Sequence, residues 1–122
     1  MFNSQRVSVV MPVYNEESVI GDILDQVAAQ PLVDEIIVVD DGSTDGTTAI
    51  VRAHPAARLV AHLYNIGNGA AVKSGIRAAS GDIILLMDAD GQHPPEEIPN
   101  LLQHIDRYDM VVGARSTGTQ AD

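Results

Sequence analysis

The fold class follows from residues 34–46, which read Asp-Glu-Ile-Ile-Val-Val-Asp-Asp-Gly-Ser-Thr-Asp-Gly. The apolar run in this stretch is rich in β-branched residues and predicts a strand over 34–40 that is buried on both faces. The segment 41–46 is typical of a turn that leads into a helix. Pro55 ends the short helix predicted over 47–53, because proline does not continue a helix. The stretch therefore predicts one strand–turn–helix unit.

The same alternation of strands and helices runs through the whole chain. The other predicted strands cover residues 7–13, 58–63, 82–87 and 109–113, and the other predicted helices cover residues 16–30, 70–79 and 96–107. This alternation predicts an α/β fold with three layers (α/β/α), in which helices cover both faces of a mostly parallel sheet. The 122 residues are expected to form a single domain, with residues 113–122 as a loose polar tail.

Composition restricts the partners of the chain. The formal net charge is −10, and the seven Lys and Arg residues form no run. This argues against nucleic acid or an anionic membrane as a direct partner. An acidic protein that binds an anionic ligand needs a helix N-terminus, a local arginine or a metal ion to do so. The absence of cysteine excludes disulfides and thiolate metal sites, and fits a reducing compartment.

The clearest chemical signal is a pair of carboxylates in the loop that follows the predicted strand 82–87. Asp88 and Asp90 stand two positions apart, and Gln92 adds a neutral oxygen. Such oxygen ligands suit Mg²⁺ or Mn²⁺, which keep waters or substrate phosphates in their other positions. The alternative is a solvated acidic turn that caps the next helix. Because ligands bind beyond the carboxyl ends of parallel strands, the position of this pair favours a metal site.

Other polar groups follow the remaining strands and are expected at the same edge of the sheet. Asp40 and Asp41 are candidates to accept hydrogen bonds from a ribose or a base, with Asp41 favoured, although one of them could only cap the helix that follows. Tyr14 could pack against a base or serve half-buried packing, and Glu16 could be a ligand or a first-turn helix charge. Arg115 follows the last predicted strand, where it could pair with a phosphate.

Glycines and histidines give weaker signals. Gly67 and Gly69 open the predicted helix 70–79, where a turn could approach a phosphate, but such a pair alone is weak evidence. His93 neighbours the carboxylate pair, yet the aspartate and glutamine oxygens suffice for a metal. The other histidines are expected to be structural or to face solvent, namely His54, His62 and His104.

Three stretches resemble the inverting family 2 glycosyltransferases, which have a Rossmann-like GT-A fold. They are residues 7–17 (Val-Ser-Val-Val-Met-Pro-Val-Tyr-Asn-Glu-Glu), residues 36–47 (Ile-Ile-Val-Val-Asp-Asp-Gly-Ser-Thr-Asp-Gly-Thr) and residues 86–94 (Leu-Met-Asp-Ala-Asp-Gly-Gln-His-Pro). The resemblance is strongest to the polyprenyl-phosphate hexose transferases, and it covers nearly the whole chain in order and spacing.

The resemblance implies a role for each matching residue in binding a nucleotide sugar. Pro12, Tyr14 and Glu16 would border the nucleoside, while Val39 and Asp41 would hold the base or the ribose. Ala89 would lie close to the nucleotide through its backbone, and Arg115 would contact a donor or acceptor phosphate. Asp88 and Asp90 form the family's Asp-x-Asp motif, and with Gln92 they would hold Mg²⁺ or Mn²⁺ against the diphosphate.

The resemblance also implies a reaction: transfer of a hexose from GDP-mannose or a UDP-sugar to an acceptor, with inversion. The expected acceptor is a polyprenyl phosphate, and no residue of this chain is identified as a catalytic base. Members of the family are usually longer, so we expect the chain to hold the donor-binding part and lack an acceptor-binding part. We therefore expect the isolated chain to bind donor without transferring sugar, and to self-associate through uncovered surfaces. A location in the cytoplasm, or at the cytoplasmic face of a membrane, is expected.

Other classes of protein share parts of this pattern. A receiver-type signalling domain would carry a phospho-accepting aspartate after the third strand and a lysine after the fifth, but Leu63-Tyr-Asn65 and Arg115 stand there. A metal-dependent nucleotidyltransferase would carry a basic, Gly-rich loop after the first strand, where this chain has Tyr14-Asn-Glu-Glu17. A family member that only binds its ligand is the third alternative.

Overall fold

A computed structural model describes residues 1–89, 94–103 and 110–113, with side chains for the first two ranges. Five strands form one sheet in the order β3-β2-β1-β4-β5, and all neighbouring strands are parallel. Their bounds are β1 (Val7–Val13), β2 (Glu35–Asp40), β3 (Ala57–Ala61), β4 (Ile83–Met87) and β5 (Met110–Gly113). Gly113 pairs with Met87, so it belongs to the predicted strand and not to the predicted tail, whose other residues, 114–122, lie outside the described part.

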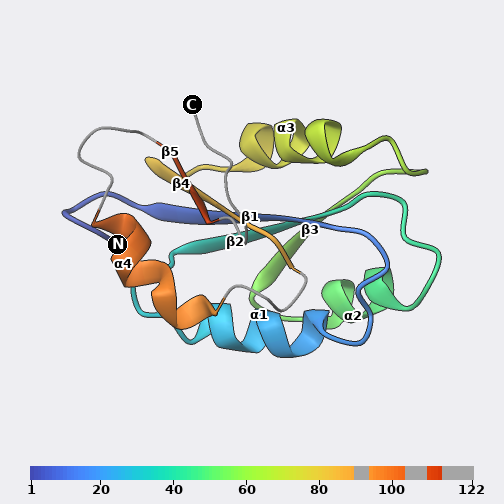
Figure 1. Ribbon diagram of the computed structural model, residues 1–122, viewed down its shortest axis with the longest axis horizontal. Coiled ribbons are helices and arrows are strands. Elements are labelled where there is room, and N and C mark those ends of the chain that lie inside the picture. The colour runs from blue at the N-terminus through green and yellow to red at the C-terminus, as the bar shows by residue number, and fades with distance from the viewer. Residues whose placement is uncertain (90–93, 104–109, 114–122) are drawn as a thin grey trace.

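Helices cover both faces of this sheet, as Figure 1 shows. The helix α3 lies on one face, and the other helices lie on the opposite face. Their bounds are α1 (Ile20–Ala28), α2 (Thr47–Ala53), α3 (Asn68–Ala78), the 3-10 helix η1 (Pro95–Glu97) and α4 (Ile98–Leu102). The predicted three-layer α/β/α architecture is therefore confirmed.

The core divides according to the period of two along β1. Val9 and Met11 belong to the apolar cluster beneath α1, while Val10 between them packs in the cluster beneath α3. Gly75 brings α3 close to the sheet, because a Cβ at this position would lie 2.3 Å from Cγ1 of Val10. A residue larger than glycine at position 75 would therefore prevent α3 from packing this closely on the sheet.

The order of the strands excludes one of the alternatives that the sequence left open, the receiver-type signalling domain. In a receiver-type domain the parallel sheet has the order 2-1-3-4-5, whereas here it is 3-2-1-4-5. The chain is therefore not a receiver domain. The direction of the strand order reverses between β1 and β4, and a ligand crevice is expected beyond the carboxyl ends of these strands.

The predicted helix over 16–30 is shorter in the structure, where α1 covers Ile20–Ala28. The backbone N–H of Glu16 donates to Oγ1 of Thr47 (2.8 Å), and that of Glu17 donates to Oδ2 of Asp45 (3.3 Å). These bonds connect the segment to the loop after β2, and regular helix begins at Ile20. The predicted apolar face is confirmed, because Ile23 and the other inward residues are buried.

Three further boundaries differ from prediction. The strand predicted over 58–63 ends at Ala61, and the helix predicted over 70–79 begins at Asn68. The helix predicted over 96–107 is a 3-10 turn followed by α4, which ends at Leu102, while residues 104–109 lie outside the described part. Among the described residues, no helix is long and apolar enough to cross a membrane.

Candidate nucleotide-binding site

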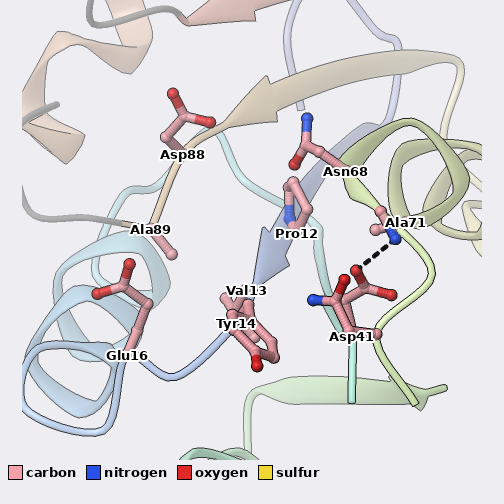
Figure 2. A pocket seen from close by; sticks show the side chains of 11 residues that line it. Pro12, Val13, Tyr14, Glu16, Asp41, Asn68, Ala71, Asp88 and Ala89 are labelled. Carbon is pink, nitrogen blue, oxygen red and sulfur yellow. Dashed lines mark hydrogen bonds between the residues drawn. The ribbon is translucent and has the colours of Figure 1, made fainter. Parts of the chain in front are cut away.

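A cavity of about 530 Å³ opens beyond the carboxyl ends of β1, β2 and β4. Four separate segments supply its wall, which consists of Pro12, Val13, Tyr14, Glu16, Asp41, Asn65, Gly67, Asn68, Ala71, Asp88 and Ala89. Figure 2 shows Asp41 on one side of the cavity, Asp88, Ala89 and Glu16 on the other, and residues 12–14 between them. The topology thus brings together residues far apart in the sequence.

Most of the predicted site residues that the structure describes line this cavity. They are Pro12, Tyr14, Glu16, Asp41, Asp88 and Ala89. Val39 does not line it, because its side chain is fully buried in the cluster between the sheet and α3. Three predicted residues, Asp90, Gln92 and Arg115, lie outside the described residues.

The position of Glu16 and Tyr14 depends on interlocking hydrogen bonds between two loops. Asn15 has a φ of +52°, donates its N–H to Oγ of Ser43 (2.9 Å), and accepts the N–H of Thr44 on Oδ1 (2.8 Å). The carboxylate of Glu17 accepts the N–H of Gly46 (2.8 Å). The motif of residues 41–47 therefore holds the loop that carries Tyr14 and Glu16, in addition to supplying Asp41.

The neighbouring aspartates Asp40 and Asp41 have different partners. Asp40 is buried, accepts the N–H of Ser43 (3.0 Å) on Oδ1, and accepts the hydroxyl of Thr48 on Oδ2. Its carboxylate therefore stabilises the turn and the first residues of α2. Asp41, by contrast, lines the cavity while being only 4% exposed.

Three donors converge on the carboxylate of Asp41. Oδ1 lies 2.7 Å from Nδ1 of His62 and accepts the N–H of Ile66 (3.0 Å), and Oδ2 accepts the N–H of Gly67 (2.8 Å). Burial raises the pKa of Asp41, but the hydrogen bonds from His62, Ile66 and Gly67 outweigh it and hold this pKa below its ordinary value. Asp41 is therefore ionised at neutral pH.

Several residues at this site were not predicted from the sequence. His62 was expected to be structural or to face solvent, yet it contacts Asp41. Asn65 and Asn68 line the cavity, although only the glycines of their turn suggested a role. The available signal was their position directly after the third strand, which is the same rule that identified Asp41 and Asp88.

The electrostatics of the cavity do not favour an anion by themselves. Three carboxylate side chains line it, and no Lys or Arg is among its described lining residues. Within the described parts of the chain, no three His, Asp or Glu side chains are clustered closely enough to hold a metal ion. Asp88 is the described member of the predicted metal set, and its predicted partners follow it within four residues in the sequence.

A partly buried carboxylate, that of Glu35, gives a testable consequence for stability. Burial raises the pKa of Glu35, but hydrogen bonds from Ser8 and Ser80 outweigh it, so this pKa is lowered, as is that of Asp41. The native state then binds fewer protons than the unfolded state, so stability is present above the ordinary carboxyl pKa values near ~4 and is lost as pH falls through and below them. We expect the urea midpoint to fall between pH 6 and pH 3.

The matched variant for this prediction is Glu35→Gln. It removes a carboxylate with a lowered pKa that does not line the cavity. Its urea midpoint should depend less on pH over the same range than that of the unmodified protein. A midpoint that stays constant or rises on acidification would contradict the assignment.

A parallel sheet of this order, with a polar cavity beyond its carboxyl edge, defines the class of Rossmann-like nucleotide-binding proteins. The family model described as "Glycosyl transferase family 2" matches residues 8–121. The chain belongs to this family. The sequence resemblance is thus confirmed.

Curated relatives carry names that describe transfer to a lipid phosphate. The chain is 44% identical over 115 residues to the undecaprenyl-phosphate 4-deoxy-4-formamido-L-arabinose transferase of Aeromonas hydrophila, covering 86% of this chain and 35% of the relative. It is 42% identical over 117 residues to the protein of that name from Edwardsiella ictaluri, covering 88% and 36%. The chain therefore spans about a third of the length of these relatives.

Solved structures confirm the GT-A fold. A mannosyltransferase from Pyrobaculum calidifontis in complex with GDP-Man and Mn²⁺ superposes with a TM-score of 0.74 at 34% identity, covering 84% of this chain and 32% of that one. Glucosyl-3-phosphoglycerate synthase from Mycobacterium tuberculosis in complex with UDP gives a TM-score of 0.72 at 34% identity, covering 84% and 40%. Another structure of this synthase contains Mn²⁺, UDP and glucosyl-3-phosphoglycerate.

Proposed function

We propose that this protein transfers a monosaccharide from a nucleoside diphosphate sugar to a polyprenyl phosphate, with inversion and with a divalent cation at the donor. The observation that carries the proposal is the cavity, which has Asp41 on one side and Asp88 on the other. The relatives named as undecaprenyl-phosphate transferases support the acceptor, and the complexes of similar structures with GDP-Man or UDP support the donor class. The sequence resemblance implies that the transferred sugar is a hexose. The similar solved structures are named as mannosyl and glucosyl enzymes, whereas the curated relatives are named for formamido-arabinose.

In this proposal the nucleoside occupies the side of the cavity formed by Asp41. The ionised carboxylate accepts a hydrogen bond from a base N–H or a ribose hydroxyl. Tyr14 is 44% exposed on the wall of the cavity, where its ring offers a face for a base to pack against. Pro12 and Ala89 line the cavity with small apolar side chains, so the ligand can approach the backbone there.

The diphosphate lies on the side of Asp88, where the acidic wall requires a counter-charge. Asp88, Asp90 and Gln92 would hold Mg²⁺ or Mn²⁺, since carboxylate and amide oxygens suit both ions. When bound, the cation supplies Lewis-acid stabilisation of the charge that develops on the leaving diphosphate. Asp88 follows the last residue of β4 directly, so a packed strand fixes its backbone.

The transfer itself exchanges one bond for another at the anomeric carbon. An oxygen of the polyprenyl phosphate forms the new bond from the face opposite the diphosphate, and the bond to the diphosphate oxygen breaks with its electron pair. This opposite-face attack inverts the anomeric carbon. The phosphate oxygen is already an anionic nucleophile, so no side chain has to remove a proton from it.

Calorimetric titration of the purified protein with UDP and GDP, in Mn²⁺ and then in EDTA, tests the donor part of the proposal. We expect one of the two nucleotides to bind in Mn²⁺, with an affinity more than about tenfold weaker in EDTA, which corresponds to about 1.4 kcal/mol. The physical reason is the repulsion between the diphosphate and the acidic wall. Equal affinity in Mn²⁺ and EDTA would refute the role of the cation.

A further inference from the structure

His62 lies directly behind Asp41 and is not part of the cavity wall. Its side chain is 11% exposed, with Nδ1 2.7 Å from Oδ1 of Asp41 and Nε2 2.8 Å from Oγ of Ser74 in α3. We propose that His62, braced by Ser74, is a positioning residue that orients the carboxylate of Asp41 toward the bound nucleoside. This inference rests on the proposed nucleoside role of Asp41.

The geometry fixes which atom donates in each of these contacts. An ionised carboxylate only accepts, so Nδ1 of His62 carries a proton and donates it to Asp41. In the neutral ring Nε2 then accepts from the hydroxyl of Ser74. In a protonated ring Nε2 donates to the same hydroxyl, which rotates to accept. Ser74 therefore holds the ring in place in either charge state.

The positions of the donors determine which oxygen of Asp41 remains available to a ligand. Oδ1 already accepts from His62 and from the N–H of Ile66, while among the described residues Oδ2 accepts only from the N–H of Gly67. A carboxylate offers about four acceptor positions, so the remaining capacity lies on Oδ2. Gly67 itself lines the cavity, which places this oxygen beside the ligand space.

Without His62 the carboxylate would be held on Oδ1 by a single backbone N–H. The terminal torsion of an aspartate is broad, so the side chain would sample other orientations and bind the nucleoside less well. A donor at the position of Nδ1 is the property that counts. The side-chain amide nitrogen of asparagine can occupy about the same position, whereas leucine keeps bulk and has no donor.

The test compares His62→Leu, His62→Asn and Ser74→Ala by calorimetry in Mn²⁺, with UDP and GDP as probes. For the nucleotide that binds, we expect affinity to fall about tenfold in His62→Leu and to stay within about threefold of the unmodified protein in His62→Asn. In Ser74→Ala, which loosens the ring without removing it, the expected loss is about two- to fivefold. Binding of Mn²⁺ with pyrophosphate, which has no nucleoside, should be unchanged in all three variants.

His54 offers a matched control, because its Nε2 lies 2.8 Å from Oδ1 of Asp25 between α1 and α2, away from the cavity. His54→Leu should leave nucleotide affinity unchanged. Equal losses in His62→Leu and His62→Asn, or a parallel loss of pyrophosphate binding, would indicate a merely structural role and overturn the inference. If His62→Leu does not fold, unchanged affinity in Ser74→Ala overturns it instead.

The same titrations separate the inference from the proposal on which it rests. If Asp41→Asn weakens nucleotide binding and His62→Leu does not, the role of His62 is wrong and that of Asp41 stands. If Asp41→Asn leaves binding unchanged, the proposed nucleoside role of Asp41 fails.

Discussion

Asp88→Ala is expected to weaken nucleoside diphosphate binding in Mn²⁺ by about tenfold or more, up to the loss that EDTA causes, since even outer-shell partners of a metal ligand contribute 10- to 100-fold to metal affinity. Asp88 is the first of the two carboxylates proposed to hold the cation, and it lies on the wall of an acidic cavity. Loss of the cation leaves the diphosphate beside Glu16 without a counter-charge. Calorimetry with the nucleotide that binds the unmodified protein provides the measurement.

Asp82 supplies the matched control for Asp88, because it precedes the same strand, β4, at the opposite edge of the sheet. Its carboxylate accepts the N–H of Arg6 (3.0 Å) and lies far from the cavity along the strand. Asp82→Ala should therefore leave nucleotide affinity within about twofold. A similar, small loss in both variants would show that Asp88 has no special role in binding.

The second large effect is expected from Asp41→Asn, which should impair both the fold of the site and nucleoside recognition. The amide nitrogen would replace an oxygen that now accepts the N–H of Gly67, and would leave two donors facing each other. An unsatisfied buried donor costs about 1–3 kcal/mol, so urea unfolding should show a loss of that size. Affinity for nucleoside diphosphate and for free nucleoside should fall by similar factors, about tenfold.

Asp40 provides a neighbouring control for this substitution. Its carboxylate is also buried, but it bonds Ser43 and Thr48 at the start of α2 and does not line the cavity. Asp40→Asn should lower stability without a selective loss of nucleoside binding. A loss in Asp41→Asn confined to the diphosphate, with free nucleoside unaffected, would assign Asp41 to the phosphates instead.

The layers of the fold could be predicted from sequence because they depend on simple periodicities. The edge of the sheet that carries the site could be predicted as well. Apolar runs gave the five strands, and the rule that ligands bind beyond parallel strand ends placed Asp41 and Asp88 together. Helix ends were harder to predict. Residues 16–19 are compatible with a helix by pattern, but in the structure regular helix begins at Ile20, and residues 16 and 17 bond instead to Thr47 and Asp45, some thirty positions away.

Side-chain partners could not be predicted from local pattern either. Nothing near His62 in the sequence indicates that its ring bridges Asp41 and Ser74, since this depends on how α3 packs on the sheet. The role implied for Val39 raises the same problem, because its side chain faces α3 and not the cavity. A family resemblance identifies which position lies near the ligand. Packing then determines whether the side chain at that position or only its backbone can contact the ligand.

The central claim is that the cavity beyond β1, β2 and β4 binds a nucleoside diphosphate with a divalent cation. A crystal structure of the protein with Mn²⁺ and the nucleotide that binds it tests this claim most directly. We expect the nucleoside beside Asp41 and Tyr14, and the diphosphate and Mn²⁺ beside Asp88. A nucleotide bound outside this cavity, or bound within it with the diphosphate against Asp41 and no cation at Asp88, would refute the proposed donor site.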